Sequence, residues 1–371
     1  MKLAMVFTFG VSLDTWHKQG VLSREKLIYE EFIRQGRFKK IYWFTYGVND
    51  KKLKHLVNEG IEIIPLPKLF KSKPGMFIYS FLMPFLRGKY FRQVGIIKTN
   101  QMKGGWTAWI ASLLYKKKFV LRGGYLWSIF ALKKYGGVYP LMVDTVEGLL
   151  CKFARAIIVT SRFQRDYIGK KYRLRKNKVF VVTNYVDINM FFPDSGIPKI
   201  KDRLVFVGRI HRDKNLKNLI LALKGLAWGL DIYGEGKLKN NIKRLAEDNS
   251  VDVKFGGVIP NARLPEILNK YIYFVLPSSY EGMPKALLEA MSCGLVVIGT
   301  NVGGIKEVIK NGENGWLIPD TTVGKIRETL SFLGRRKDIE RNLAVHARRD
   351  IEDEFSLVSI AEQEFNILKK A

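Results

Sequence analysis

Short runs of Val, Ile, Leu and Phe alternate with helical stretches along the chain, in two successive series. The first series of expected strands is Leu3–Phe9, Lys40–Thr45, Ile61–Pro65, Gly95–Lys98, Phe119–Arg122, Ala156–Val159 and Lys178–Val182. The second series is Leu204–Val207, Leu230–Tyr233, Val253–Phe255, Tyr273–Leu276 and Val296–Thr300. Apolar strands separated by helices are typical of parallel sheets that are covered on both faces. The sequence therefore predicts an α/β protein with two Rossmann-like, doubly wound domains facing each other across a cleft.

The expected boundary between the domains has the composition of a loop, with Pro193, Gly196 and Pro198 close together. The 371 residues are enough for two domains of ordinary size. The predicted divisions are an N-terminal domain over 1–184, a linker over 185–202, a C-terminal domain over 203–350 and a C-terminal helix over 351–371 that packs back on the first domain.

The net charge of +29 is concentrated in the first half of the chain. Residues 1–180 carry 35 Lys and Arg against 10 Asp and Glu, whereas residues 181–371 carry 28 against 24. Segments 68–92 and 106–118 mix bulky apolar side chains with cations, a pattern typical of binding at a membrane surface. Each cation near an anionic surface contributes about 1 kcal/mol. We therefore expect the basic half to bind an anionic membrane surface, the alternative being that 76–86 is core and the lysines are solvated.

Targeting signals are weak. The apolar run Leu3–Phe9 is too short for a signal peptide, and no window of ~18 apolar residues predicts a transmembrane helix. Cys151 and Cys293 form neither a disulfide framework nor a metal-binding spacing, which favours a reducing compartment. The expected location is the cytoplasm, peripheral at the cytoplasmic membrane face.

Two carboxylates, Glu281 and Glu289, lie eight residues apart around an expected helix start. Pro284 is a suitable first helical residue, and Gly294 suits the left-handed position just past the end. Apolar residues surround Glu289, which predicts its burial. A buried carboxylate requires a partner, and a polyhydroxylated ligand would supply one. Lys285, one turn earlier, is the alternative partner, in a pair worth ~0.2–0.5 kcal/mol.

A second cluster of interest is basic. The expected strand Leu204–Val207 runs into Gly208 and a turn containing Arg209, Arg212 and Lys214, just before an expected helix. Cations at a strand end near a helix start favour an anion, although a solvated basic loop has the same composition. Glycine-rich turns also follow the next two expected strands, at 234–236 and 256–257.

An ordered set of motifs spans residues 182–320. The matching segments are Thr183–Asp187, Val207–Ile210, Tyr233–Gly236, Phe255–Gly257, Pro277–Pro284, Glu289–Gly294 and the stretch that begins with Gly303 and Gly304 and ends at Gly315. This set resembles the family 4 retaining glycosyltransferases, glycosyltransferase group 1, which have the GT-B fold. The resemblance is dense over about residues 180–320 and weak before them.

The resemblance implies a nucleotide-sugar donor, UDP- or GDP-linked, held mainly by the second domain. Arg209 and Lys214 match the pair that binds the diphosphate, Glu281 the carboxylate facing the sugar hydroxyls, and Glu289 the one that binds the ribose diol. These roles make Glu281, Arg209 and Lys214 the expected catalytic residues. The further expected donor-binding residues are Gly10, Gly208, Val258, Gly282, Met283, Pro284 and Lys285. No cofactor and no metal is expected, because the cations would stabilise the leaving diphosphate.

The predicted function is a retaining, metal-independent transfer of a hexose-type sugar from the donor to a lipid-linked or polysaccharide acceptor. A nucleotide-sugar epimerase or phosphorylase on the same fold is the alternative. A second alternative is a nucleic-acid-binding protein, which the pI of about 9.9 suggests. However, no recognition motif of the usual nucleic-acid-binding modules is evident. No histidine lies where the family often has one, so no catalytic base is assigned. Arg122, before two glycines, either faces the cleft or is structural.

Overall fold

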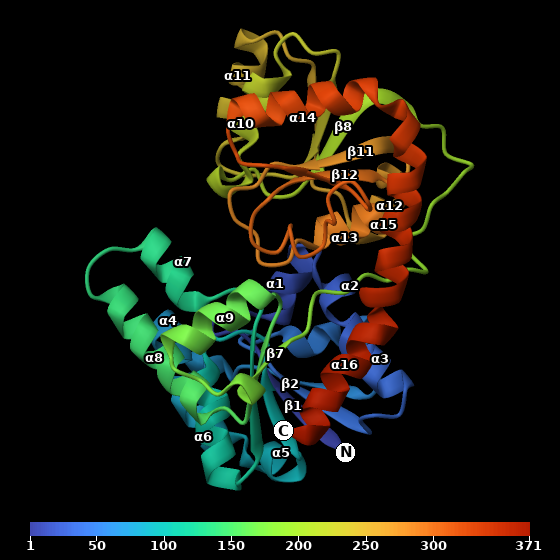
Figure 1. The fold of residues 1–371 in the computed structure, drawn as a ribbon. Coiled ribbons are helices and arrows are strands. Elements are labelled where there is room, and N and C mark those ends of the chain that lie inside the picture. The colour runs from blue at the N-terminus through green and yellow to red at the C-terminus, as the bar shows by residue number, and fades with distance from the viewer. The chain divides into compact units, whose positions relative to one another are not determined.

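The computed structural model describes residues 1–371, apart from the side chain of Lys133. The chain divides into two compact units. Unit 1 contains residues 1–183 and 360–371, and unit 2 contains residues 184–359. Each unit is built on its own parallel sheet, so the predicted α/β class is confirmed (Figure 1).

The sheet of unit 1 has seven parallel strands in the order β3-β2-β1-β4-β5-β6-β7. Their bounds are β1 (Lys2–Val6), β2 (Lys40–Phe44), β3 (Ile61–Ile64), β4 (Ile96–Thr99), β5 (Lys118–Gly123), β6 (Ala156–Val159) and β7 (Val179–Val181). In the register, Leu3 of β1 lies between Ile41 of β2 and Ile96 of β4, and all three side chains are buried. Strand addition reverses direction between β1 and β4, and such a switch point is where open parallel sheets bind ligands.

Nine α-helices accompany the described strands of unit 1 before the chain enters unit 2. They are α1 (Leu13–Lys18), α2 (Leu22–Glu25), α3 (Leu27–Arg34), α4 (Lys73–Leu86), α5 (Gly88–Gln93), α6 (Gly105–Tyr115), α7 (Trp127–Lys134), α8 (Tyr139–Phe153) and α9 (Arg162–Lys171). Short 3₁₀ turns occur at η1 (Asp50–Leu56), η2 (Lys68–Phe70) and η3 (Lys176–Lys178). Helix α6 contacts both α4 and α8, so these three helices form one side of the unit (Figure 1).

Helix α4 continues through an internal proline. Pro84 has no N–H, so the carbonyl of Ser80 loses its usual partner four residues later. The hydroxyl of Thr107 on α6 donates to that carbonyl instead, at 2.6 Å. The indole N–H of Trp106 also donates to the hydroxyl of Ser80, at 2.8 Å. These two bonds fix which face of α4 points inward.

The last helix, α16 (Leu357–Lys370), is held in unit 1 by a buried ionic cluster. Glu364 forms an ion pair with Lys98 of β4, and the guanidinium of Arg122 on β5 lies 3.5 Å from the second carboxylate oxygen. The ammonium of Lys98 also donates to the hydroxyl of Tyr29, at 3.1 Å. Burial lowers the pKa of Lys98 to about 8, although Glu364 opposes the change. Burial also disfavours the charged form of Glu364, but the attraction of Lys98 and Arg122 outweighs it, so the pKa of this carboxyl is lowered.

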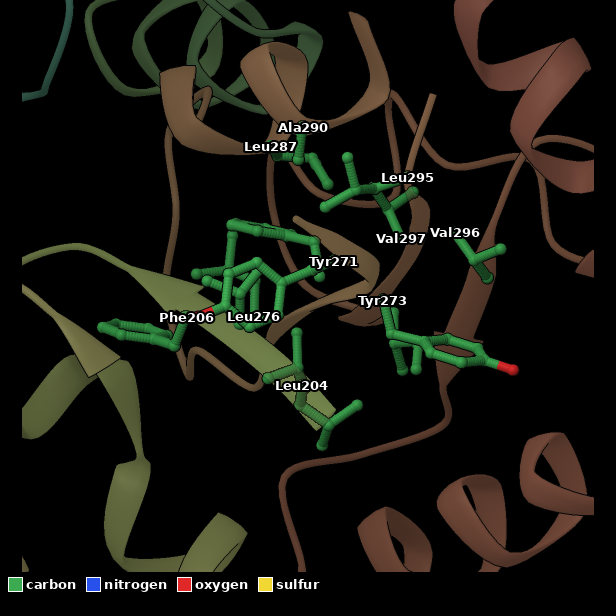
Figure 2. Close-up of a cluster of buried hydrophobic side chains, with 14 of the residues drawn as sticks. Leu204, Phe206, Tyr271, Tyr273, Leu276, Leu287, Ala290, Leu295, Val296 and Val297 are labelled. Atoms are coloured by element: carbon green, nitrogen blue, oxygen red, sulfur yellow. The ribbon is translucent and has the colours of Figure 1, made fainter. Parts of the chain in front are cut away.

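Unit 2 has six parallel strands in the order β10-β9-β8-β11-β12-β13. Their bounds are β8 (Ile200–Val207), β9 (Gly229–Tyr233), β10 (Val253–Gly257), β11 (Tyr271–Leu276), β12 (Val296–Thr300) and β13 (Trp316–Ile318). Its helices are α10 (Leu216–Leu223), α11 (Lys239–Asp248), α12 (Leu264–Leu268), α13 (Lys285–Ser292), α14 (Val323–Arg335) and α15 (Glu340–Glu354), with turns η4 (Arg212–Lys214), η5 (Asn261–Arg263) and η6 (Lys337–Ile339). Figure 2 shows Leu287 and Ala290 of α13 beside the strand residues Tyr271 and Leu276 in the core.

Several elements differ from the sequence-based expectation. Strand β13 was not predicted. Segment 185–202, predicted as a linker, lies within unit 2, where Phe191 is buried. The terminal stretch 351–371 is the end of α15 followed by α16, and residues 360–371 belong to unit 1. No helix formed by the described residues is both long and apolar enough to cross a membrane.

Candidate functional site

The candidate site lies at the switch point of the unit 2 sheet, between β8 and β11. The loops that follow these two strands are joined by a bond from the backbone N–H of Ser279 to the carbonyl of Asp213, at 2.8 Å. Because β8 and β11 are parallel neighbours, their carboxyl ends bring Lys214 and Glu281 together as an ion pair. The hydroxyl of Ser278 donates to the same carboxylate oxygen, at 2.8 Å. The site therefore has a fixed cation and carboxylate at the edge where ligands bind in such sheets.

The Lys214–Glu281 pair is partly shielded from water. The exposed fraction is 19% for the Lys214 side chain and 12% for that of Glu281. Charges at this depth interact more strongly than charges on an open surface. Arg209 is exposed on the same loop, two residues after β8, so its guanidinium is accessible to a ligand.

Glycines allow the strand ends to approach closely. The N–H of Gly208 donates to the carbonyl of Tyr233, and the N–H of Gly234 donates to the carbonyl of Gly257. A Cβ on Gly234 would lie 1.9 Å from the Gly208 oxygen, so no larger residue fits there. The glycines that follow β8 and β9 and the glycine that ends β10 therefore form one layer of hydrogen-bonded backbone.

The turn that carries Glu281 is held by a second glycine pair. The N–H of Gly304 donates to the carbonyl of Glu281, at 2.9 Å. A Cβ on Gly304 would lie 1.8 Å from the oxygen of Gly282, and one on Gly303 would lie 2.3 Å from the oxygen of Glu281. The amide of Asn184 donates to the carbonyl of Met283, at 2.6 Å. The backbone of Gly304 on one side and the side chain of Asn184 on the other thus fix residues 281–283.

Helix α13 begins one residue later than predicted. Pro284 is its N-cap, with an extended ψ of 115°, and Lys285 is the first helical residue. Gly294 has a φ of 72°, the left-handed conformation expected just past the helix. Glu289 is buried as predicted, and the amide of Asn261 donates to its Oε1, at 3.3 Å. The Lys285 ammonium lies 5.4 Å from the ring centre of Tyr185.

The remaining predicted residues fall in two places. Val258 is exposed directly after β10, and Met283 is buried in the turn before α13. Gly10 belongs to unit 1, where it follows β1 with a φ of 77°. The structure thus brings the predicted residues of unit 2 to the carboxyl ends of its strands, and Gly10 to the equivalent edge of the other sheet.

The switch point of unit 1 is lined by aromatic residues. The N–H of Phe9 donates to the carbonyl of Lys103, which joins the loops after β1 and β4. Gly104 has a φ of 92°, and a Cβ there would lie 2.8 Å from the nitrogen of Phe9. The ring of Phe9 lies 5.4 Å from Tyr46 and 5.6 Å from Trp106.

Sequence reasoning missed several residues. Ser278 and Asn261 contact the predicted carboxylates, and only the position of Ser278 right after a strand could have indicated a role. Arg122 was left open between two roles, and the structure places it buried beside Glu364. Among the described residues, no group of three or more His, Cys, Asp or Glu could hold a metal ion.

Comparison with known proteins gives consistent results. The sequence model described as "Glycosyl transferases group 1" matches residues 187–350, which lie in unit 2. The alpha-maltose-1-phosphate synthase of Mycolicibacterium smegmatis is 27% identical over 305 residues, covering 74% of this chain and 79% of that protein. Sucrose-phosphate synthase from Thermosynechococcus elongatus aligns over 100% of this chain and 98% of its own, with a TM-score of 0.80 and 18% identity. Anabaena HepE, solved in complex with UDP, aligns over both whole chains, with a TM-score of 0.77 and 18% identity.

Proposed function

The chain is a glycosyltransferase of group 1 with the GT-B fold, and from this premise we propose that it transfers a hexose-type sugar from a UDP- or GDP-linked donor. The proposed acceptor is lipid-linked or a glycan. The proposed reaction retains the configuration at the anomeric carbon and uses no metal. The observation that carries the proposal is the Lys214–Glu281 pair at the switch point of unit 2.

The leaving group determines what the cations do. A nucleoside diphosphate departs with two negative charges, and Arg209 and Lys214 would stabilise that charge as it develops. Preorganised stabilisation of this kind is usually the largest single contribution to catalysis. The backbone N–H groups at the start of α13, near Gly282 and Lys285, also favour an anion, because they point out of the helix end.

The carboxylates have separate roles in the proposal. Glu281 would accept hydrogen bonds from the donor sugar while Ser278 and Lys214 hold its position. Glu289 would accept hydrogen bonds from the ribose hydroxyls of the donor, which would lie near Val258 and Gly208. Asn261 supports this role, because its amide already donates to Glu289, and its buried carbonyl oxygen has no hydrogen-bond partner among the described residues. A ribose hydroxyl would supply that missing donor.

The proposed chemistry needs no protein base. The acceptor would attack from the same side as the leaving diphosphate, which takes the acceptor proton as it departs. The acceptor would bind at unit 1, and the proposed location is the cytoplasmic face of the membrane, where the basic unit 1 meets anionic lipid. The charge of residues 1–180 supports this location.

The experiment has two stages. A panel of UDP- and GDP-sugars is first screened for thermal stabilisation, because a bound donor raises apparent stability as its concentration exceeds its Kd. Donor consumption is then measured for Arg209→Ala and Glu281→Gln beside Lys217→Ala and Glu266→Gln, which replace an exposed cation and an exposed carboxylate away from the pair.

We expect Arg209→Ala and Glu281→Gln each to lower turnover at least ~100-fold, as when one charge-stabilising group is removed. Lys217→Ala and Glu266→Gln should keep the wild-type turnover. Wild-type turnover in either site variant would contradict the proposal. A product that is an epimerised nucleotide sugar, or a sugar phosphate formed from a glycan and phosphate, would identify the alternative chemistries.

A further inference from the structure

Unit 1 exposes an unusual number of large apolar side chains on one set of helices. On α4 the exposed residues are Phe77, Ile78, Phe81, Leu82, Phe85 and Leu86. Helices α6, α7 and α8 add Leu113, Leu114, Phe130, Leu132, Leu141, Met142, Leu149 and Phe153. We call this set the apolar band. Exposed apolar patches of this extent mark interaction sites rather than ordinary surface.

The outward direction of the band is fixed by packing. Tyr79, Ser80 and Met83 of α4 are buried, and Ser80 receives the two hydrogen bonds from α6 described above. The opposite face of α4, which carries Phe85 at 59% exposure, therefore cannot turn inward without breaking them. The exposure of the band is a property of the folded unit.

Ring contacts join the parts of the band on α4, α6 and α8. Phe81 of α4 stacks on Trp106 of α6 at 5.9 Å, and Trp109 of α6 stacks on Phe153 of α8 at 4.7 Å. Phe77 of α4 also contacts Phe9 at the switch point of unit 1, at 6.0 Å. The band thus runs from the ligand-binding edge of this sheet to the far end of α8.

The charge around the band is mainly positive, because Asp144 of α8 forms an ion pair with Lys171 and Glu147 of α8 is buried. Residues 63–143 contain no Asp or Glu, while Lys68, Lys71, Lys73, Lys89, Lys116 and Lys134 are among the cations that they carry. A bulky apolar face bordered by cations is the composition of helices that lie in the interface of an anionic bilayer.

A cationic cavity borders one end of the band. It has a volume of about 800 Å³, and Phe153 of the band is part of its lining. The lining also includes Lys152, Arg155, Arg173, Arg175 and Lys178, and it contains no Asp or Glu side chain. Burial lowers the pKa of Lys178, so the cation there gains from a neighbouring anion.

We infer that the apolar band is a docking surface for an anionic lipid bilayer, with lipid phosphates in the cationic cavity beside Phe153. The inference rests on the proposed function, because a lipid-linked acceptor would then stay in the bilayer while its polar end reaches the switch point near Phe9. A second protein is disfavoured as the occupant, because a bilayer satisfies a broad apolar face and a mainly cationic border together.

The test is vesicle co-sedimentation of the full chain, with phosphatidylcholine vesicles alone and with about 30% phosphatidylglycerol, enough to give a negative surface potential. Phe85→Ser/Leu86→Ser removes apolar area from α4, and Leu141→Ser/Met142→Ser removes it from α8. Arg173→Glu/Arg175→Glu reverses charge at the cavity. Val345→Ser/Val358→Ser is the control, since both residues are exposed and lie in unit 2. Donor-induced thermal stabilisation is measured for every variant.

We expect the wild type to prefer the phosphatidylglycerol vesicles by at least tenfold. Each band variant and the cavity variant should lose at least tenfold in that binding, the control should keep it, and all should keep donor stabilisation. Equal binding by wild type and band variants, or band-dependent self-association without vesicle binding, would overturn the inference. If no nucleotide sugar raises the thermal stability of the wild type, that result contradicts the proposed function, whereas the vesicle binding still tests the docking surface.

Discussion

The buried ionic cluster of α16 gives a quantitative prediction for the variant Glu364→Gln. Glu364 is fully buried and faces two cations, Lys98 and Arg122. The glutamine keeps the shape and removes the negative charge, which leaves both cations buried without compensation. Removing one partner of a buried ion pair costs about 3–5 kcal/mol. For a unit of this size, that corresponds to a lower Tm by roughly 6–20 °C.

The assay is urea unfolding followed by tryptophan fluorescence. Trp16, Trp43, Trp106, Trp109 and Trp127 lie in unit 1, so the signal reports mainly on that unit. The matched control is Glu362→Gln on the same helix.

Glu362 pairs with Arg37 at 2.5 Å, but both side chains are partly open to solvent, and a pair near the surface is worth about 0–1 kcal/mol. Equal losses for Glu364→Gln and Glu362→Gln would refute the reasoning.

The pH dependence supplies an independent readout. Burial lowers the pKa of Lys98 from 10.5 to about 8 in the folded protein. Between pH 8 and 10.5 the unfolded chain therefore binds more protons than the folded one, so the contribution of Lys98 to the free energy of unfolding rises with pH, by about 3 kcal/mol at most. Lys98→Met should remove this rise. Glu364→Gln should make the rise begin at lower pH, because Glu364 is the main group that raises the pKa of Lys98 in the folded protein.

Two further predictions concern the site and α4. Gly304→Ala should abolish thermal stabilisation by a nucleotide sugar, because its Cβ would meet the backbone oxygen of Gly282. The control Gly324→Ala lies on α14, where the added Cβ meets no atom, and it should raise the free energy of unfolding in urea by ~0.5–1 kcal/mol. Donor stabilisation retained in Gly304→Ala would contradict the first. Thr107→Val should lower the free energy of unfolding by ~1–3 kcal/mol, because the carbonyl of Ser80 beside Pro84 loses its donor; a loss below ~0.5 kcal/mol would contradict this.

The strands were predictable because buried parallel strands form continuous apolar runs, and each predicted run coincides at least in part with a strand of the structure. Strand β13 escaped because it has only three residues, Trp316–Ile318, between polar segments. Most helices of unit 1 were not predicted either. Helix α4 begins with a capping serine, Ser72, but it combines an internal Pro84 with apolar residues on both faces, so no helical period identified it.

For the candidate site, the sequence indicated residue types and local positions, and it could not indicate contacts. Lys214 and Glu281 are 67 residues apart, and they meet only because β8 and β11 are neighbours in the sheet. Lys98 and Glu364 are 266 residues apart, and no local pattern of charge indicates that α16 returns to β4. Such pairs depend on strand order, which sequence periodicity does not determine.

The segment 76–86 shows how the structure resolves an ambiguity of composition. Its sequence allowed two interpretations, a buried core element or a surface for membrane contact. In the structure the two apply to opposite faces of α4, since Tyr79 and Met83 are buried while Ile78 and Phe85 are exposed. Hydrophobicity alone indicates how much apolar surface a helix has, whereas its packing partners decide which face remains outside. In α4 the hydrogen bonds from Trp106 and Thr107 to Ser80 hold one face inward, and they therefore determine which apolar side chains remain available for docking to a bilayer.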